Sequence, residues 1–374
     1  MMRWCWTGVY GAIERRPAAA ASAAATAPQS VALVVGSMGV VGAALLDILP
    51  GQDTPGGPWK VYALSRGPLP PWSSPPPSPA VTHLHLDLAD AAAVAQALAP
   101  LTDITHVFYA AWSPFPGAAE DEAREANCAM LRNVLAAAVP ACPALAHVCL
   151  HTGRADVLLE ELGSSMESSV PDGGGAVITW SVHRPVATVF GFSPRSESNV
   201  IASLCVYAAI CCKEGAALRW SGSRVAWEGF SDASDAELVA EHALWAALEP
   251  SVKNQTFNCT NGDVYKWKNL WPMLASRFEM EWSGYEGEAG RFKLEDAMAG
   301  KEALWAEIVR EKGLVETELN DITCWRFVDT IINADKEQLE NMNKSKEHGF
   351  LGFRNTVRSF NSWIGKMKVN RIVS

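Results

Sequence analysis

The chain has 374 residues, of which 49% are hydrophobic and 19% charged, the balance of a globular protein with room for one large α/β unit or two joined domains. Its formal net charge of -10 argues against a nucleic-acid partner. The nine cysteines lack zinc-type spacing and favour a reduced, cytoplasmic setting, and the longest apolar run, 200–212, is too short to cross a membrane.

Residues 1–30 are expected to form a disordered, Ala-rich leader. This segment contains three arginines and one acidic residue, but it has no apolar stretch of the kind found in secretory signals. Secretion is therefore not expected, whereas an organelle transit peptide remains an alternative to a plain leader.

The stretch from Val31 to Gly42, VALVVGSMGVVG, predicts a strand, a tight turn and a helix. Glycines at such a turn let the backbone approach a pyrophosphate, whose charge then lies at the helix N-terminus. A glycine-rich turn in the core is the alternative interpretation. The candidate cofactor-binding residues of this turn are Gly36, Met38, Gly39, Val40, Val41 and Gly42.

The second strand ends at Ser65 and Arg66, where NAD-binding versions of this fold carry an acidic residue that binds the ribose 2'-hydroxyl. A hydroxyl and a guanidinium suit a 2'-phosphate instead, so NADPH is favoured over NADH. The alternative is a surface arginine before a proline-rich loop. The third strand ends at Asp87 and Leu88, where such domains hold the adenine.

Two histidines of the third strand, His83 and His85, share one strand face and could be mistaken for metal ligands. No third ligand stands near them in the sequence, so no metal site is expected.

Helices at 89–99 and 127–138 alternate with strands at 106–112, 146–153 and 177–185. This alternation indicates a parallel sheet with right-handed crossovers. The expected fold class is α/β, a Rossmann-type doubly wound parallel sheet with a smaller mixed α/β C-terminal substrate domain. Because sites in such sheets lie at the C-terminal ends of the strands, further cofactor candidates are Ala111, Trp112, Thr152, Gly153 and Pro185.

The pattern of elements changes after residue 185. We expect residues 31–185 to form the NADPH-binding domain and residues 186–374 to form the substrate-binding region, with a strand near 256–260 that returns to the main sheet. Tryptophan and phenylalanine are frequent in the second region. Most of them are expected in the core, and some could line an apolar substrate cavity.

Several stretches resemble the plant progesterone 5β-reductases and iridoid synthase-like reductases, an atypical branch of the extended short-chain dehydrogenase/reductases. Among them are VALVVGSMGVVG, PLTDITHVFYAAW, HVCLHTGR, TWSVHRP, SDASDAELVAEH and MNKSKEHGFLGFRN, and the likeness spans about residues 31 to 370. It implies NADPH-dependent 1,4-reduction of enones and enals, including Δ4-3-ketosteroids. It also implies a Tyr hydroxyl that stabilises the enolate oxygen and a Lys that poises the Tyr and contacts the cofactor ribose.

The chain departs from this family where those two residues belong. Thr152, Gly153 and Arg154 are followed at once by ADVLLEE, which resembles the helix that comes after the Tyr in the family. No Lys occurs between Lys60 and Lys213, and no Tyr between Tyr109 and Tyr207, so no catalytic residue can be assigned. The 25 residues from 152 to 176 still exceed what a parallel crossover requires, so the fold is expected to form, with a short helix near 155–162.

Three hypotheses follow for the function. The first is an NADPH-dependent reductase of activated C=C bonds that is catalytically impaired, the second a non-catalytic NADP(H)-binding homologue that acts as a sensor or partner subunit, and the third a chain that lacks one exon. The expected partner is a small enone, enal or steroid, with a homodimer as an option and no membrane. The resemblance implies substrate contacts by Trp112, Ser196, Asn199, Phe350 and Phe353. Glu197 places a charge in a turn that is apolar in the family. For Phe350 and Phe353, packing in the core is an equal alternative to contact with the substrate.

Overall fold

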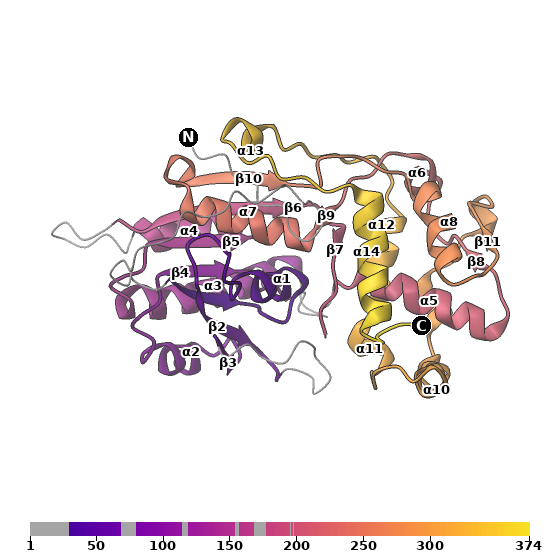
Figure 1. Ribbon diagram of the computed structural model, residues 1–374, viewed down its shortest axis with the longest axis horizontal. Coiled ribbons are helices and arrows are strands. Elements are labelled where there is room, and N and C mark those ends of the chain that lie inside the picture. The colour runs from indigo at the N-terminus through magenta and orange to yellow at the C-terminus, as the bar shows by residue number, and fades with distance from the viewer. Residues whose placement is uncertain are drawn as a thin grey trace.

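The protein folds as a parallel α/β sheet unit joined to a mainly helical C-terminal part, as a computed structural model shows (Figure 1). The structure describes residues 30–68, 80–113, 119–153, 157–167, 177–194, 196 and 198–374. The expected leader lies outside the described residues except for Ser30, as do Arg154 and Glu197.

The main sheet has seven parallel strands in the order β10-β6-β5-β4-β1-β2-β3. The order reverses between β1 and β4, which is the arrangement of a doubly wound Rossmann sheet and confirms the predicted fold class. The strand expected near 256–260 is β10, which pairs with β6 at the edge of the sheet. The strands are β1 (Val31–Val35), β2 (Lys60–Ser65), β3 (Val81–His85), β4 (His106–Tyr109), β5 (His147–His151), β6 (Thr179–Pro185) and β10 (Gln255–Cys259).

Helices cover both faces of this sheet (Figure 1). The apolar side chains of α1 and α7 form one buried cluster with the C-terminal part, and those of α2, α3 and α4 form a second cluster on the opposite face. Both faces are therefore buried, which is why the central strands read as continuous apolar runs. The helices are α1 (Val40–Ile48), α2 (Ala91–Leu98), α3 (Glu120–Ala141), α4 (Val157–Glu167) and α7 (Ala236–Leu248).

Several element boundaries differ from the sequence-based expectation, and three of these elements show a local reason for the difference. β4 ends at Tyr109 rather than residue 112, because its neighbour β1 turns away after Val35, the partner of Tyr109. α3 begins at Glu120 rather than 127, because three acidic residues in its first turn favour a helix N-terminus. α4 occupies 157–167 rather than 155–162, and its buried Leu158 and Leu162 pack in the cluster of α3, so the shortened crossover still closes.

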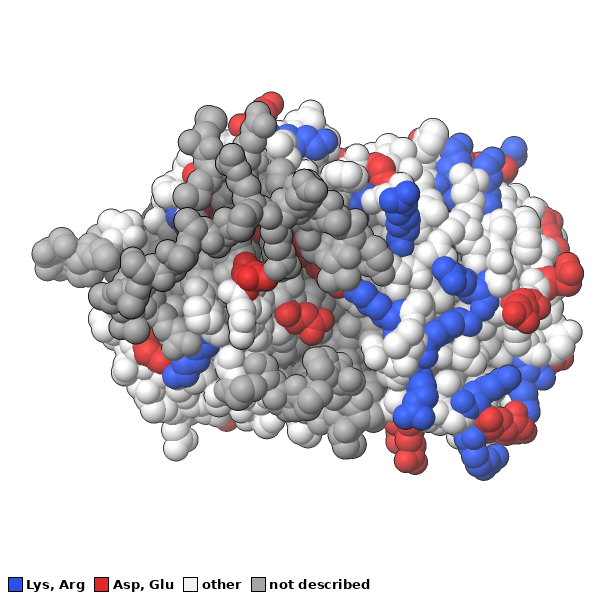
Figure 2. Space-filling view, viewed as in Figure 1, with Lys and Arg blue, Asp and Glu red and all other residues white. Residues whose placement is uncertain are grey.

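The C-terminal part is built mainly from helices, with two short two-stranded sheets and two 3-10 turns at Pro250–Val252 and Glu288–Gly290. On the face in Figure 2, Lys and Arg side chains gather over this part. Helix α14 contains Arg358, Lys366 and Lys368 and no acidic residue. The elements are β7 (Val189–Phe190), α5 (Val200–Glu214), β8 (Leu218–Arg219), α6 (Arg224–Glu228), β9 (Ser234–Asp235), α8 (Trp267–Arg277), β11 (Trp282–Ser283), α9 (Leu294–Met298), α10 (Glu302–Lys312), α11 (Leu319–Ile322), α12 (Trp325–Ile332), α13 (Asn343–Glu347) and α14 (Thr356–Val369).

Asp235 ties α7 to α14 through a buried carboxylate. One of its oxygens accepts the backbone N–H groups of Glu237 (2.9 Å) and Leu238 (3.3 Å) and so caps α7. The other accepts the hydroxyl of Ser359 (2.5 Å) and the indole N–H of Trp363 (3.0 Å) on α14. Four donors therefore depend on one buried side chain.

We expect Asp235→Ala to lower the free energy of unfolding by about 3 to 4 kcal/mol, because it removes a helix cap and leaves buried donors unsatisfied. Urea denaturation measures the change. The matched control is Asn355→Ala, which removes only the exposed cap bond to the N–H of Arg358 (2.9 Å) and should cost about 1 kcal/mol. Similar losses in the two variants would contradict the role given to Asp235.

Candidate functional site

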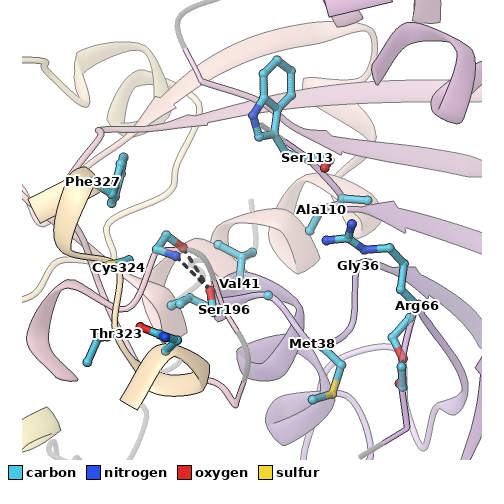
Figure 3. A pocket seen from close by; sticks show the side chains of 18 of the residues that line it. Gly36, Met38, Val41, Arg66, Ala110, Ser113, Ser196, Thr323, Cys324 and Phe327 are labelled. Atoms are coloured by element: carbon cyan, nitrogen blue, oxygen red, sulfur yellow. Dashed lines mark hydrogen bonds between the residues drawn. The ribbon is translucent and has the colours of Figure 1, made fainter. Parts of the chain in front are cut away.

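A cavity of about 1410 Å³ lies at the C-terminal edge of the sheet, between the glycine turn after β1 and the helices α9 to α12 (Figure 3). It meets the sheet where the strand order reverses, between β1 and β4. Ligands of doubly wound sheets bind in this position.

The turn after β1 can be made only with glycines. Gly36 has a φ of +82°, and a Cβ placed on it would lie 2.7 Å from the backbone of Ala111. A Cβ on Gly42 would lie 2.2 Å from the carbonyl oxygen of Gly36. The backbone N–H groups of Gly36 and Ser37 both donate to Leu64 O at 3.0 Å, which ties the turn to β2.

The N-terminus of α1 opens onto the cavity. Its cap residue, Gly39, has no side chain to accept a bond from the first turn of the helix. Met38, Gly39, Val40 and Val41 line the cavity, whereas Gly42 lies behind them against Gly36. Uncapped N–H groups and the helix dipole make such a helix end suitable for an anion such as a diphosphate.

The ends of β2 and β3 supply the adjoining wall, with Ser65, Arg66, Asp87 and Leu88 all lining the cavity. Asp87 accepts the backbone N–H of Ala89 at 3.0 Å, which holds its carboxylate at the start of the next segment. Arg66 runs from the end of β2 across the cavity beside the glycine turn (Figure 3). No acidic residue stands at the end of β2, so the wall is compatible with a 2'-phosphate.

The end of β4 completes the sheet side of the cavity with Ala110, Ala111, Trp112 and Ser113. Trp112 is 51% exposed, so this end of the cavity is open to water. The side chain of buried Asn127, on α3, fixes the segment: it accepts the N–H of Ser113 at 2.9 Å and donates to its carbonyl at 2.8 Å. Sequence reasoning missed Ser113 and Asn127, since the residues after β4 follow no regular pattern.

The opposite wall comes from α9 to α12, which sequence reasoning did not assign to the site. Asp329 on α12 accepts the N–H groups of Leu294 and Glu295 at 2.9 Å each, so α9 and α12 are held together. The sequence signal for this wall is the amphipathic pattern of α12, which predicts a buried face on the helix but not the element that packs against it. The residues of this wall are Glu295, Met298, Ala299, Glu302, Asn320, Thr323, Cys324, Trp325, Arg326, Phe327 and Thr330.

Among the substrate candidates, Trp112 and Ser196 line the cavity, and the Ser196 hydroxyl lies 3.1 Å from that of Ser198 (Figure 3). Asn199 is buried instead, where it bonds the backbone of Ser193 at both ends, and the Ser193 hydroxyl donates to Met38 O at 2.9 Å. Asn199 therefore supports the glycine turn from behind.

The remaining candidates do not line the cavity. Thr152 and Gly153 follow β5, and the N–H of Thr152 donates to His183 O at 3.1 Å. Pro185 ends β6. Phe350 is buried against His242 and Trp245, and Phe353 is 70% exposed on the surface.

No Tyr or Lys is found among the described residues that line the cavity. Tyr109, the tyrosine of β4, lies in the buried cluster beneath α2, α3 and α4, where its hydroxyl has no partner and burial raises its pKa. It is not in a position to donate into the cavity. Serine and threonine hydroxyls are therefore the neutral O–H donors that the described lining offers.

Within the described residues, no three or more His, Cys, Asp or Glu side chains are grouped so that they could hold a metal ion. In the same part of the chain, none of the helices has the length and apolarity needed to cross a membrane.

The fold and the cavity together define a class of architecture, the doubly wound Rossmann-type sheet with a ligand cavity where the strand order reverses. An epimerase from Methanothermobacter thermautotrophicus has a similar fold (TM-score 0.61, 13% identity, 92% of this chain and 95% of that chain). A yeast methylglyoxal/isovaleraldehyde reductase, solved with NADPH, also has a similar fold (TM-score 0.52, 13% identity, 91% of this chain and 99% of that chain).

The sequence comparisons identify the family. The chain is 46% identical over 399 residues to an (S)-8-oxocitronellyl enol synthase from Nepeta cataria and 42% identical over 407 residues to a 3-oxo-Delta(4,5)-steroid 5-beta-reductase from Arabidopsis thaliana, with 100% of each chain covered. No profile of a known protein family matches it. The chain belongs to the family of plant progesterone 5β-reductases and iridoid synthases, as the resemblance indicated.

Proposed function

We propose that this chain binds NADPH and reduces activated C=C bonds of enones and enals, with slow turnover because the Lys and Tyr of the family are missing. The observation that carries the proposal is a cavity with a complete anion-binding turn and an arginine at the end of β2, but without a Tyr or Lys among its described lining residues. In this proposal residues 31–185 bind the cofactor and residues 186–374 bind the substrate.

The residues present fit the cofactor. The first-turn N–H groups of α1 would bind the diphosphate, Arg66 with Ser65 would bind the 2'-phosphate, and Asp87 with Leu88 would hold the adenine. When bound, NADPH supplies the hydride that reduces the β-carbon of the substrate. Gly36 and Gly39 permit this approach, since the cavity is reached there by backbone alone.

The substrate side of the cavity binds and orients but offers weak support for the reaction. Negative charge develops on the carbonyl oxygen during 1,4-reduction, and a positioned donor normally stabilises it. Serine and threonine hydroxyls are weaker acids than a tyrosine hydroxyl, and the open end at Trp112 admits water that competes for the oxygen. Both features favour slow turnover.

The lengths of the alignments support a missing segment. The alignment with the Nepeta cataria enzyme spans 399 positions against 374 residues in this chain, which leaves 25 positions without a counterpart here. Sequencing the transcript between the codons of Arg154 and Ala155 tests the alternative that this chain lacks one exon.

The experiment that tests the proposal combines binding and turnover. Quenching of NADPH fluorescence measures the dissociation constant, and NADPH oxidation with 2-cyclohexen-1-one or progesterone measures the rate. Slow oxidation above the enzyme-free background supports the impaired reductase. Tight binding with no oxidation favours the second candidate, a non-catalytic NADP(H)-binding homologue, and absence of binding would overturn both.

Arg66→Ala should weaken NADPH binding by about 10- to 100-fold, because charge-assisted bonds to a phosphate contribute about 1.5 to 3 kcal/mol. The affinity for NADH, which lacks the 2'-phosphate, should change little. Arg326→Ala removes an arginine from the opposite wall and is the matched control, for which the ratio of the two affinities should stay constant. An equal loss of NADPH and NADH binding in Arg66→Ala would contradict the assignment.

We also propose a cytoplasmic location. The eight cysteines of the described residues are all free thiols, most of them buried, which suits a reducing compartment.

A further inference from the structure

Most of the hydroxyl groups that line the cavity already donate their protons within the protein. The described lining residues with a hydroxyl group are Ser65, Ser113, Ser196, Ser198, Thr323 and Thr330. The Ser65 hydroxyl donates to Gly67 O at 2.7 Å. Thr323 and Thr330 each donate to the carbonyl oxygen four residues earlier in the chain, at 2.8 and 2.9 Å. These three protons are therefore not available to a bound substrate.

Ser196 and Ser198 form a pair. Their hydroxyl oxygens lie 3.1 Å apart and share one hydrogen bond, so one proton of the pair stays available. The pair belongs to the segment before α5, which the Ser193 hydroxyl ties to Met38 O at 2.9 Å. This segment is therefore held against the glycine turn, where the diphosphate lies in the proposed binding mode, and the available proton suits a phosphate oxygen.

The Ser113 hydroxyl differs from the others, because it has no hydrogen-bond partner among the described residues. It is also not sealed off from solvent, as the unpartnered hydroxyls of Ser221 and Ser283 are. Ser113 is only 7% exposed and lines the cavity at the end of β4 (Figure 3). The accessible part of its hydroxyl therefore faces the cavity, and its proton is available to a group bound there.

Asn127 holds the backbone of Ser113 in one conformation. Its side chain bonds both the N–H and the carbonyl of Ser113, and it also donates to Ala123 O at 2.8 Å, in the preceding turn of α3. A serine oxygen is separated from the backbone by a single rotatable bond, so a fixed backbone leaves the hydroxyl a few staggered positions. A donor that is positioned in advance is the kind that stabilises charge as it develops.

The strand order places Ser113 on the reactive side of the cavity. In the proposed binding mode the adenosine half of the cofactor lies at the ends of β2 and β3, and the diphosphate lies at the turn after β1. Since β4 flanks β1 on the other side, the nicotinamide half is left for the end of β4. Trp112 at this end is open to water, whereas Ser113 is buried, and a donor acts more strongly where water is excluded.

We propose that the Ser113 hydroxyl stabilises the enolate oxygen in this chain, in place of the absent Tyr, an inference that rests on the proposed reductase function. The substrate accepts a hydride from NADPH at its β-carbon and is reduced, and NADP+ is the oxidised product. The C=C π electrons form a new double bond to the carbonyl carbon, and the carbonyl π electrons move to the oxygen. Ser113 donates a hydrogen bond to this oxygen and keeps its proton, because an alkoxide is a stronger base than an enolate. The α-carbon then takes its proton from water, which enters at Trp112.

Binding of 4-nitrophenolate to the full chain in the presence of NADP+ tests the proposal without turnover. This anion has a six-membered ring and a charged oxygen, as the enolate of 2-cyclohexen-1-one has, and its absorbance reports hydrogen bonding to that oxygen. Ser113→Ala should weaken its binding by about 10- to 100-fold, the change expected for one hydrogen bond to a charged group, and should lower the residual kcat by a similar factor. Ser113→Thr keeps the hydroxyl and should retain most of the affinity and of the rate.

Unchanged phenolate affinity in Ser113→Ala would overturn the proposal, as would a loss seen with Ser196→Ala instead or a wild type that does not bind the phenolate. The melting temperature and the affinity for NADPH check that Ser113→Ala keeps the fold and the cofactor site. Phenolate binding that depends on Ser113 in a chain without enone turnover would contradict the reductase and support the donor. Slow turnover that is equal in the wild type and Ser113→Ala would support the reductase and overturn the donor.

Discussion

Insertion of the missing family segment between Arg154 and Ala155 should raise kcat for enone reduction by about 100- to 1000-fold. The segment is taken from the Nepeta cataria relative, in which we expect it to carry both the Lys and the Tyr. A single oxyanion donor contributes about 2.7 to 4 kcal/mol to the transition state, which corresponds to this change in rate. The measurement is single-turnover oxidation of bound NADPH with 2-cyclohexen-1-one, which isolates the chemical step.

The position of the insertion supports this expectation. β5 ends at His151, and α4 begins at Val157, so the new residues enter at the C-terminal edge of the sheet, the same edge on which the cavity lies. Both anchors are well held: His151 is buried in the sheet, and α4 is fixed to α3 by the bidentate pair of Arg132 with Glu161 (3.0 and 2.6 Å). The rest of the fold should therefore tolerate the longer connection.

The matched control is the same insertion with its Tyr replaced by Phe. This variant restores the length and packing of the connection but not the hydroxyl, so it should keep the affinity for NADPH and lose most of the gain in kcat. Equal rates in the two insertion variants would mean that the segment acts by closing the cavity to water. In that case the absent donor would not be the cause of slow turnover.

The sheet could be predicted from sequence because its signals are local. Five consecutive apolar residues before Gly36, most of them β-branched, indicate a strand buried on both faces, and the glycine spacing that follows fits a tight turn. The end of β2 could be interpreted in the same way, because Arg66 at this position favours a cofactor with a 2'-phosphate over one without it. Local sequence therefore predicted the cofactor side of the cavity.

The other wall could not be predicted because its contacts are not local. Helix α12 has a clear apolar face, but the sequence does not show that Asp329 would hold α9 beside it and turn both toward the glycine turn. Phe350 and Phe353 illustrate the same limit. Their alternation predicts opposite directions, yet only the tertiary structure shows that inward means the core around Trp245 and outward means solvent.

Acidification from pH 7 to pH 5 should unfold the protein, because five buried histidines are neutral in the folded state. Burial lowers the pKa of His106 and His151 to about 4 and that of His242 to about 3. It also lowers the pKa of His147 and His183 well below the usual range. In the unfolded chain each of them would titrate near pH 6.5.

A chain of hydrogen bonds explains why three of these histidines resist a proton. Thr179 donates its hydroxyl proton to Ala146 O, so it must accept the Nδ1–H of His147 at 2.8 Å. In the neutral tautomers that follow, Ser181 donates to His147 Nε2 (2.9 Å) and accepts the Nε2–H of His183 (2.9 Å).

This series of hydrogen bonds continues through a contact between ring nitrogens of His183 and His242. His242 Nδ1–H donates to His183 Nδ1 at 2.8 Å, which leaves His242 Nε2 as an acceptor. The Ser345 hydroxyl donates to it at 3.0 Å, the shorter of its two contacts, rather than to Asn258 O at 3.4 Å. A proton added to His183 would set two N–H donors against each other across that 2.8 Å contact. The bond linking β6 to α7 would then break.

The difference in proton binding between the unfolded and folded states gives the sign and size of the change in stability with pH. Below pH 6.5 the unfolded chain binds protons that the folded chain refuses, so stability falls as the pH falls, by about 2 kcal/mol per histidine at pH 5. Glu241 and Asp47 oppose this, because burial raises their pKa values to about 7 and about 6, and their protonation returns about 3 kcal/mol in total over the same range. Five histidines outweigh these two carboxyls, and the net loss of about 6 kcal/mol is comparable with the whole stability of a typical domain.

Tryptophan fluorescence and far-UV circular dichroism followed from pH 7 to pH 4 measure the transition, which we expect near pH 5. His151→Leu removes one titrating group that lies outside the hydrogen-bonded chain, so the dependence of unfolding free energy on pH should flatten by about one proton, or 1.4 kcal/mol per pH unit. Thr82→Ala changes an exposed residue of β3 that does not titrate and is the control, with no change in slope expected. An unfolding free energy that stays constant between pH 7 and pH 5 would show that the five histidines are not held neutral by the fold.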